Sequence, residues 1–323
     1  MDNYFLVFSN GEKIGDGIIK LSLLHEIRKR FSDYKIIWVA NGTTVYANKL
    51  KLFSDKYIYK VIEHADLNPF FWNNVSSNQF LKENKFEYIF DTQKAVPRTI
   101  ALKRLNYDNF FSNAAKGFFS NNKKLRNSKN KKYYLDELLD LLNEIKKNDN
   151  DIDYKIEISQ KLLNKLSEVF NPKFKYLGIA PGAGEENKIW PIKNFIKVAK
   201  FYEQKKYKIV WFLGPEEKNI LPLIKNEFPS SIFPEELIIR YSSIEIIMAS
   251  TKYLSCALSN DSGASHILST KNCTLIKLFG PKNSSKFTPL NKSLKTISSN
   301  EFNSNDIKSI TVERVINEIN NIL

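Results

Sequence analysis

The hydrophobic positions of this chain fall into short continuous runs that alternate with segments of helical periodicity. Tyr4 to Ser9 and Ile36 to Ala40 are apolar runs that lack a polar face, and residues 18 to 31 between them repeat apolar side chains at helical spacing. Continuous apolar runs are typical of parallel strands that helices cover on both faces. The pattern therefore predicts an α/β fold.

The same alternation continues to the end of the chain. Further strands are expected at Tyr57 to Ile62, Tyr88 to Phe90, Tyr176 to Ala180, Ile209 to Leu213, Leu254 to Leu258 and Cys273 to Leu278. Helices are expected at Tyr133 to Lys147, Pro191 to Gln204, Glu216 to Glu227, Ser243 to Ser250 and Ile307 to Leu323. Ser242 and Glu245 have the spacing of a capping box, which supports a helix that begins at Ser243.

The length of 323 residues exceeds that of a single hydrophobic core, so two domains are expected. We place them at residues 1–170 and 171–323, each a doubly wound parallel sheet, and expect the last helix, 307–323, to pack back on the first domain. A stretch rich in lysine and asparagine, at about residues 106–150, is interpreted as an excursion of the first domain. Ligands of such sheets bind beyond the carboxyl ends of the strands.

Composition narrows the class of protein. The chain is 42% hydrophobic and 13% aromatic, as in globular proteins, and carries a net charge of +14. Only seven of its 49 basic residues are arginine, and the lysines are dispersed, so no nucleic-acid partner is predicted. Cys256 and Cys273 stand in apolar contexts without metal-ligand spacing and are interpreted as buried thiols of a reducing compartment. With neither a signal peptide nor an apolar run of about 18–20 residues, we expect a cytoplasmic protein.

Three polar segments follow predicted strands and carry the candidate chemistry. Asn260 to His266 enters a helix and is typical of an anion site, although the same pattern also forms a simple helix cap. Asp16, between Gly15 and Gly17, is either a reactive carboxylate or a helix cap. Lys188 precedes a predicted helix, where an ammonium group is unfavourable unless an anion lies beside it; it is a phosphate ligand or a solvated surface lysine.

An acidic stretch is a further candidate site. Asp149, Asp151 and Asp153 form two D-x-D patterns, which hold a divalent metal in some sugar-nucleotide enzymes. Here they lie in a polar run without a preceding strand, so no metal site is predicted.

The ordered motifs resemble those of glycosyltransferase family 9, the lipopolysaccharide heptosyltransferases. The resemblance rests on Gly15-Asp16, Asp91-Thr92-Gln93, Pro181-Gly182-Ala183, Lys188-Ile189-Trp190-Pro191, Leu213 to Glu217 with the family's Gly-x-x-Glu turn, Asn260 to His266 and Leu278 to Pro281. It is strongest over residues 176–281, thinner over 1–105 and absent from 106–170. The chain departs from the family at Gly17, Ser22 and Ala180, where an aliphatic residue, a proline and a histidine are usual.

The resemblance implies the GT-B fold, with two Rossmann-like domains facing a cleft, the first on the acceptor side and the second binding the nucleotide sugar. It implies inverting, metal-independent transfer of a sugar, heptose from ADP-heptose, to a lipopolysaccharide core or other glycan, with no cofactor. It also implies the residue roles. Asp16 is the catalytic base, Lys188, Ser262 and Gly263 hold the diphosphate, Glu216 binds the ribose, and Ser242 lies beside the adenine. Asp261 binds the sugar or the loop, and His266 either orients that loop or is a structural histidine. Asp91, Gln93 and Arg98 lie on the acceptor side.

Two other functions remain open from the sequence. One is a sugar-nucleotide epimerase on the same fold, and the other is a non-catalytic basic binding module. The lipid-linked acceptor of the family and the charge of +14 predict reversible contact with anionic membrane, at the inner face of the inner membrane. The basic stretch Lys123 to Lys132 is the local candidate for this contact, with a solvated loop as the alternative.

Overall fold

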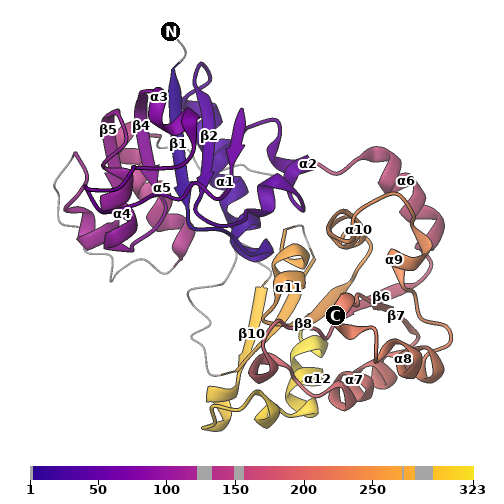
Figure 1. The fold of residues 1–323 in the computed structure, drawn as a ribbon. Helices are drawn as coiled ribbons and strands as arrows, with labels where there is room; N and C mark the ends of the chain where they lie inside the picture. Colours follow the sequence, from indigo (N-terminus) through magenta and orange to yellow (C-terminus); the bar gives the residue numbers. More distant parts are fainter. Residues whose placement is uncertain (1–2, 122–132, 149–155, 271–272, 281–293) are drawn as a thin grey trace. The chain divides into compact units, whose positions relative to one another are not determined.

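The computed structural model describes residues 3–121, 133–148, 156–270, 273–280 and 294–323. The chain divides into two compact units, Met1–Tyr154 and Lys155–Leu323, each built around its own sheet with helices along it (Figure 1). We describe each unit by itself.

The first unit contains a five-stranded parallel sheet with the strand order β3-β2-β1-β4-β5. Its strands are β1 (Tyr4–Ser9), β2 (Lys35–Ala40), β3 (Lys60–Ile62), β4 (Phe86–Asp91) and β5 (Tyr107–Ser112). Its helices are α1 (Ile14–Arg30), α2 (Lys51–Ser54), α3 (Gln79–Glu83), α4 (Val96–Leu102) and α5 (Tyr134–Ile145), with 3₁₀ turns η1 (Val45–Ala47) and η2 (Ala114–Gly117).

The second unit contains another five-stranded parallel sheet, with the order β10-β9-β8-β6-β7. Its strands are β6 (Lys175–Ala180), β7 (Tyr207–Trp211), β8 (Cys256–Asn260), β9 (Leu275–Phe279) and β10 (Leu294–Ser298). Its helices are α6 (Gln160–Val169), α7 (Ile192–Gln204), α8 (Leu221–Glu227), α9 (Pro234–Leu237), α10 (Ser243–Ser250), α11 (Gly263–Leu268) and α12 (Val312–Asn320), with 3₁₀ turns η4 (Glu186–Lys188), η5 (Pro215–Glu217), η7 (Ser299–Phe302) and η8 (Ile307–Ser309).

The apolar runs are buried on both faces, as their lack of alternation predicts. Four consecutive residues of β1, Phe5 to Phe8, are fully buried, because helices cover the sheet on either side. In the second unit, α12 packs on α7, and Val315 and Ile319 of α12 join the core. The predicted α/β class with two parallel sheets is confirmed.

Several boundaries differ from those expected. Tyr107–Ser112, expected within the excursion of the first domain, forms the edge strand β5. The units divide earlier in the chain than residue 170, because Leu162 and Leu166 bury the apolar face of α6 against the second unit, where α6 contacts α9 and α10. The expected C-terminal helix consists of the turn η8 followed by α12. Both cysteines are free and buried, and no described helix has the length and apolarity needed to cross a bilayer.

The strand orders locate the ligand-binding edge of each sheet. In the first unit the winding reverses direction between β1 and β4, and in the second between β6 and β8. Ligands of doubly wound sheets bind beyond the carboxyl ends of the strands at this reversal. Asp16 follows β1 and Asp91 ends β4, while Lys188 follows β6 and Asp261 follows β8. The candidate residues therefore lie where the topology favours a site.

Candidate active site

Asp16 lies in the first turn of α1 at the carboxyl end of β1. The helix begins earlier than the sequence pattern predicts, with Lys13 as its N-cap and no capping hydrogen bond from that side chain. The alternative that Asp16 caps the helix is therefore wrong. Its carboxylate is half-buried beside the positive end of the helix dipole, where a negative charge is favoured.

Gly17 departs from the family pattern for a packing reason. A Cβ atom on this glycine would lie 2.5 Å from Cγ2 of Val45 and 2.7 Å from Cδ1 of Leu50. The hydroxyl of Tyr46 donates a 2.6 Å hydrogen bond to the carbonyl of Gly17. The turn η1 thus packs directly on the start of α1, and a larger residue at position 17 would require Val45 and Leu50 to shift.

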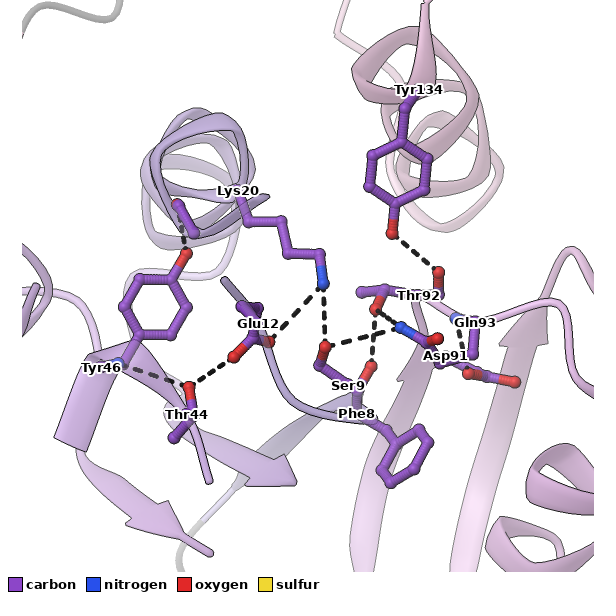
Figure 2. Close-up of polar contacts among 11 residues, drawn as sticks. Phe8, Ser9, Glu12, Lys20, Thr44, Tyr46, Asp91, Thr92, Gln93 and Tyr134 are labelled. Atoms are coloured by element: carbon purple, nitrogen blue, oxygen red, sulfur yellow. Dashed lines mark hydrogen bonds and ion pairs between the residues drawn. The ribbon is translucent and has the colours of Figure 1, made fainter. Parts of the chain in front are cut away.

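A buried polar cluster lies beside the start of α1 (Figure 2). Lys20 is 2% exposed; its ammonium donates to Oγ of Ser9 at 2.8 Å and lies 3.5 Å from Oε1 of Glu12. The other carboxylate oxygen of Glu12 accepts a hydrogen bond from Thr44 at 2.5 Å. On the far side of Lys20, the hydroxyl of Tyr134 donates to the carbonyl of Thr92 at 2.9 Å. The sequence pattern did not identify this cluster.

Burial and charge act on Asp16 in opposite directions. Burial raises the pKa of Asp16, and the nearby Glu12 carboxylate raises it further. Lys20 and Lys13 hold it lower. The pKa of Lys20 is itself lowered by burial, against the charges of Glu12, Asp16 and Asp91. A half-buried carboxylate with a raised pKa can accept a proton at neutral pH more readily than a solvated one.

Asp91 is fully buried and its oxygens hold neighbouring elements. Oδ2 accepts hydrogen bonds from Thr99 at 2.7 Å and Ser112 at 2.8 Å, and Oδ1 accepts one from the backbone of Gln93 at 2.8 Å. Burial raises the pKa of Asp91 to about 6, although these donors oppose the rise. The side chain of Gln93 donates toward Ser9 at 3.5 Å, and Arg98 lies half-buried in the first turn of α4.

In the second unit, two lysines converge on Asp261 at the carboxyl edge of the sheet. Nζ of Lys277 lies 2.6 Å from Oδ1 of Asp261, and Nζ of Lys188 lies 3.7 Å from Oδ2. Lys188 also pairs with Glu185 at 2.9 Å. These carboxylates supply the counter-charge that the position of Lys188 ahead of α7 requires. Lys277 extends from β9, has a fully buried side chain, and was not predicted from the sequence.

Charge and burial in this cluster set the protonation of Asp261 and His266. Burial alone would raise the pKa of Asp261, but Lys277 and Lys188 hold it below its ordinary value. Burial, reinforced by Lys277, lowers the pKa of His266 to about 3, so the imidazole is neutral at physiological pH. Its Nδ1 atom is buried without a hydrogen-bond partner among the described residues.

The two predicted serines cap helices. Ser262 begins α11: its Oγ accepts from the backbone of Ser265 at 3.4 Å, and its own N–H donates to Oγ of Ser265 at 3.2 Å. Gly263 is the first residue of α11. Ser242 forms the predicted capping box, in which its Oγ and N–H donate to Glu245 at 2.8 and 2.9 Å. The prediction of a helix at Ser243–Ser250 is confirmed.

The turn after β7 presents two glutamates differently. Glu216 is exposed, whereas Glu217 is half-buried against two glycines. A Cβ atom on Gly182 would lie 2.4 Å from Oε1 of Glu217, and one on Gly214 would lie 2.7 Å from Oε2. The pKa of Glu217 is raised by burial. Spacing gives the signal for this residue, because Glu217 is the fourth residue of a Gly-x-x-Glu turn that begins at Gly214.

The structure bears on the acidic and basic stretches only in part. Among the described residues, no three His, Cys, Asp or Glu side chains come together as a metal ion would need. Asp149, Asp151 and Asp153 lie outside the described residues, as do Lys123 to Lys132 and Pro281.

Comparison with known proteins gives the same fold and a family. The profile of "Glycosyltransferase family 9 (heptosyltransferase)" matches residues 76–316. A sequence search of curated proteins finds no match. Among solved structures, a family 9 glycosyl transferase from Veillonella parvula has a TM-score of 0.74 at 17% identity and covers 100% of this chain and 98% of its own.

Two structures from E. coli are similar. The ADP-heptose heptosyltransferase II has a TM-score of 0.68 at 14% identity, covering 99% of this chain and 98% of its own. The heptosyltransferase WaaC with ADP has a TM-score of 0.69 at 16% identity, covering 98% of this chain and 97% of its own. Both units are thus spanned by these matches, and the predicted GT-B fold is confirmed.

Proposed function

Since the chain belongs to glycosyltransferase family 9 and is a glycosyltransferase, we propose that it transfers heptose from ADP-heptose to a lipopolysaccharide core or other glycan, with inversion. The main observation that supports this proposal is that two lysines, Lys188 and Lys277, converge on Asp261 at the carboxyl edge of the second sheet. Two ammonium groups in a largely buried setting provide the positive potential that a departing diphosphate requires. The ADP complex of the E. coli relative supports ADP as the nucleotide.

The second unit supplies the groups for the donor. Lys188 is exposed enough to leave Glu185 and meet a phosphate, while the buried Lys277 keeps Asp261 ionised to accept hydrogen bonds from sugar hydroxyls. Ser262, Gly263 and the neutral His266 border the same loop. Because ammonium groups stabilise the leaving group, we propose transfer without a metal ion or other cofactor.

For the ribose we propose Glu217 together with, or in place of, Glu216. Ribose hydroxyls are donors that a carboxylate can accept in pairs. Glu217 lies against Gly182, in the loop after β6, and Gly214, in the loop after the neighbouring strand β7. Glu216 is exposed. Ser242, at the start of α10, remains the proposed neighbour of adenine.

Asp16 is the proposed base. Its carboxylate accepts the proton of the acceptor hydroxyl as the oxygen attacks the anomeric carbon, while the bond from that carbon to the diphosphate oxygen breaks and ADP leaves with the electron pair. The half-buried position and raised pKa of Asp16 support this role. We propose that Gln93 and Arg98 contact the acceptor and that Asp91 supports their loop through its three hydrogen bonds.

The test is Asp16→Asn, which keeps the shape of the side chain but removes its basicity. We expect the rate of acceptor-dependent transfer to fall by about 10²–10⁴-fold, the usual contribution of a general base, with unchanged ADP affinity in calorimetry. The matched control is Asp33→Asn, an exposed aspartate beyond the end of α1, which is expected to transfer at the wild-type rate.

Wild-type protein is assayed in parallel with EDTA. Full activity in the chelator is expected, and loss of activity that manganese or magnesium restores would instead implicate Asp149, Asp151 and Asp153. Wild-type turnover by Asp16→Asn would remove Asp16 from the mechanism. Activity on ADP-heptose that needs no acceptor would favour an epimerase.

A further inference from the structure

Lys20 places a positive charge in the interior of the first unit. Its side chain is 3% exposed, its ammonium lies 2.8 Å from Oγ of Ser9 and 3.5 Å from Oε1 of Glu12, and the rings of Trp38 and Tyr134 lie 5.9 Å away. Burying a charge is costly unless it is paired. A shorter apolar residue would fill this position on α1 at lower cost, so the charge calls for a reason beyond packing.

The helix brings Lys20 to the same face as Asp16. The two residues are four apart in α1, so their side chains lie one turn apart on one side of the helix. The ammonium is held in place from the other side, because Glu12 is itself fixed by Thr44 and Ser9 ends β1. Figure 2 shows the ammonium held between Ser9 and Glu12, and helix spacing places this immobilised cation one turn from the candidate base Asp16.

We propose that Lys20 is a positioning residue that keeps the carboxylate of Asp16 in its proton-accepting, ionised form. This inference rests on the proposed function, in which Asp16 takes the proton of the acceptor hydroxyl. Burial alone favours the protonated, neutral form of a carboxyl group, which cannot accept the proton of the acceptor hydroxyl, and a fixed cation opposes this effect.

Several charged or titratable groups of the described elements surround Asp16. They are Lys13 and Glu12 in the preceding loop, Lys20 on α1, Tyr134 on α5, and Asp91 at the end of β4, which acts on Lys20. Burial raises the pKa of Asp16; Lys20 gives the largest opposing effect, Glu12 adds to the rise, and Lys13 contributes least. Removing Lys20 should therefore raise the pKa of Asp16, whereas removing the charge of Glu12 removes both a carboxylate that repels Asp16 and the carboxylate that keeps Lys20 charged.

The experiment is the pH profile of kcat/KM for transfer by the full chain. On the acid limb, activity falls about tenfold per pH unit as the base is protonated. Lys20→Met is expected to move this limb to higher pH, so that its loss is large at acidic pH and disappears at alkaline pH. Lys20→Arg keeps the charge and is expected to restore the wild-type limb.

The exposed Lys13 gives the matched control, because Lys13→Met removes a cation of the same segment and should move the limb less than Lys20→Met. Coincident acid limbs for the wild type and Lys20→Met would overturn the proposal, since a purely structural lysine changes the rate at every pH alike. Should Lys20→Met fail to fold, Lys20→Gln, which can still donate to Ser9, decides: a raised limb supports the proposal and an unchanged limb overturns it.

A direct titration separates this inference from the proposed function. Carbon NMR of labelled carboxyl groups, with Asp16→Asn to assign the signal, follows Asp16 without any turnover. A higher titration midpoint in Lys20→Met is the expected result, whichever residue is the base. If that midpoint moves but Asp16→Asn retains full transfer, the proposed base is wrong while the electrostatic coupling stands; an unmoved midpoint overturns the inference itself.

Discussion

Lys277→Met is the substitution that tests the buried charges of the second unit most directly. Methionine fills nearly the same volume in β9 but removes the ammonium that lies 2.6 Å from Asp261. Asp261, whose side chain is only 10% exposed, would keep its charge with Lys188 alone as a cation, at 3.7 Å. The variant therefore leaves a nearly buried carboxylate short of a partner.

The expected loss follows from this geometry. Removing one partner of a buried ion pair costs about 3–5 kcal/mol, because the other charge stays buried without compensation. Lys188 and the residual exposure of Asp261 both relieve the carboxylate, so we expect the lower end, about 3 kcal/mol. For a unit of this size, that loss lowers the unfolding midpoint by about 6–12 °C.

Scanning calorimetry of the full chain resolves the result, because only the transition of the second unit should move. The control is Lys225→Met, which removes the same type of group from an exposed pair, 2.8 Å from Glu236, and should cost less than about 1 kcal/mol. A second variant, Lys277→Met with Asp261→Asn, removes both charges and should recover most of the loss.

A loss of stability in Lys277→Met no larger than that in Lys225→Met would contradict the expected effect of an uncompensated charge on Asp261. A double variant that is less stable than Lys277→Met would contradict it too, since the loss would then come from packing around β9 and not from an uncompensated charge. In either case Lys277 would have no electrostatic part in holding Asp261 ionised.

Two further predictions concern the same unit. Burial lowers the pKa of His266 to about 3 in the folded protein, so between about pH 6.5 and 3 only the unfolded chain binds that proton. The free energy of unfolding should therefore fall by about 1.4 kcal/mol for each unit by which the pH is lowered in this range. Urea titrations of His266→Gln should show a weaker dependence of stability on pH. For the nucleotide, Glu217→Gln should weaken ADP binding in calorimetry by about 10–100-fold, which corresponds to the loss of a charged hydrogen bond. Glu216→Gln should change ADP affinity by less than about twofold. A larger effect for Glu216→Gln than for Glu217→Gln would indicate that Glu216 binds the ribose.

Hydrophobic patterning predicted most of the fold because parallel strands that are buried on both faces appear in the sequence as continuous apolar runs. The run Tyr4 to Ser9 matches β1, and the capping box at Ser242 matches the start of α10. The strand β5 was not predicted because Asp108 and Asn109 interrupt its apolar run. These polar residues are tolerated because β5 is an edge strand with a partly exposed amino end. Helix α6 was not predicted because only two of its residues, Leu162 and Leu166, are buried.

The sequence located only part of the candidate site, for a physical reason. Residues that follow strand ends, such as Asp16, Lys188 and Asp261, could be found from strand and motif positions, since topology alone brings them to one edge of a sheet. The partners that fix their ionisation lie inside regular elements. Lys20 falls within the apolar stripe of α1 and Lys277 within the apolar run of β9.

Charged residues inside apolar runs are therefore more informative than the runs themselves. In a helix or strand that is buried on both sides, a lysine has no route to solvent and must be paired with a carboxylate from a neighbouring element. Here both such lysines lie near the carboxyl edge of a sheet: Lys20 near Asp16 in the first, and Lys277 against Asp261 in the second. Each thereby sets the charge of an acid whose proposed role depends on being ionised, the base in one unit and a donor ligand in the other. The sequence signal was present in both places, as a lysine four residues after Asp16 and as a lysine in the middle of Leu275–Phe279.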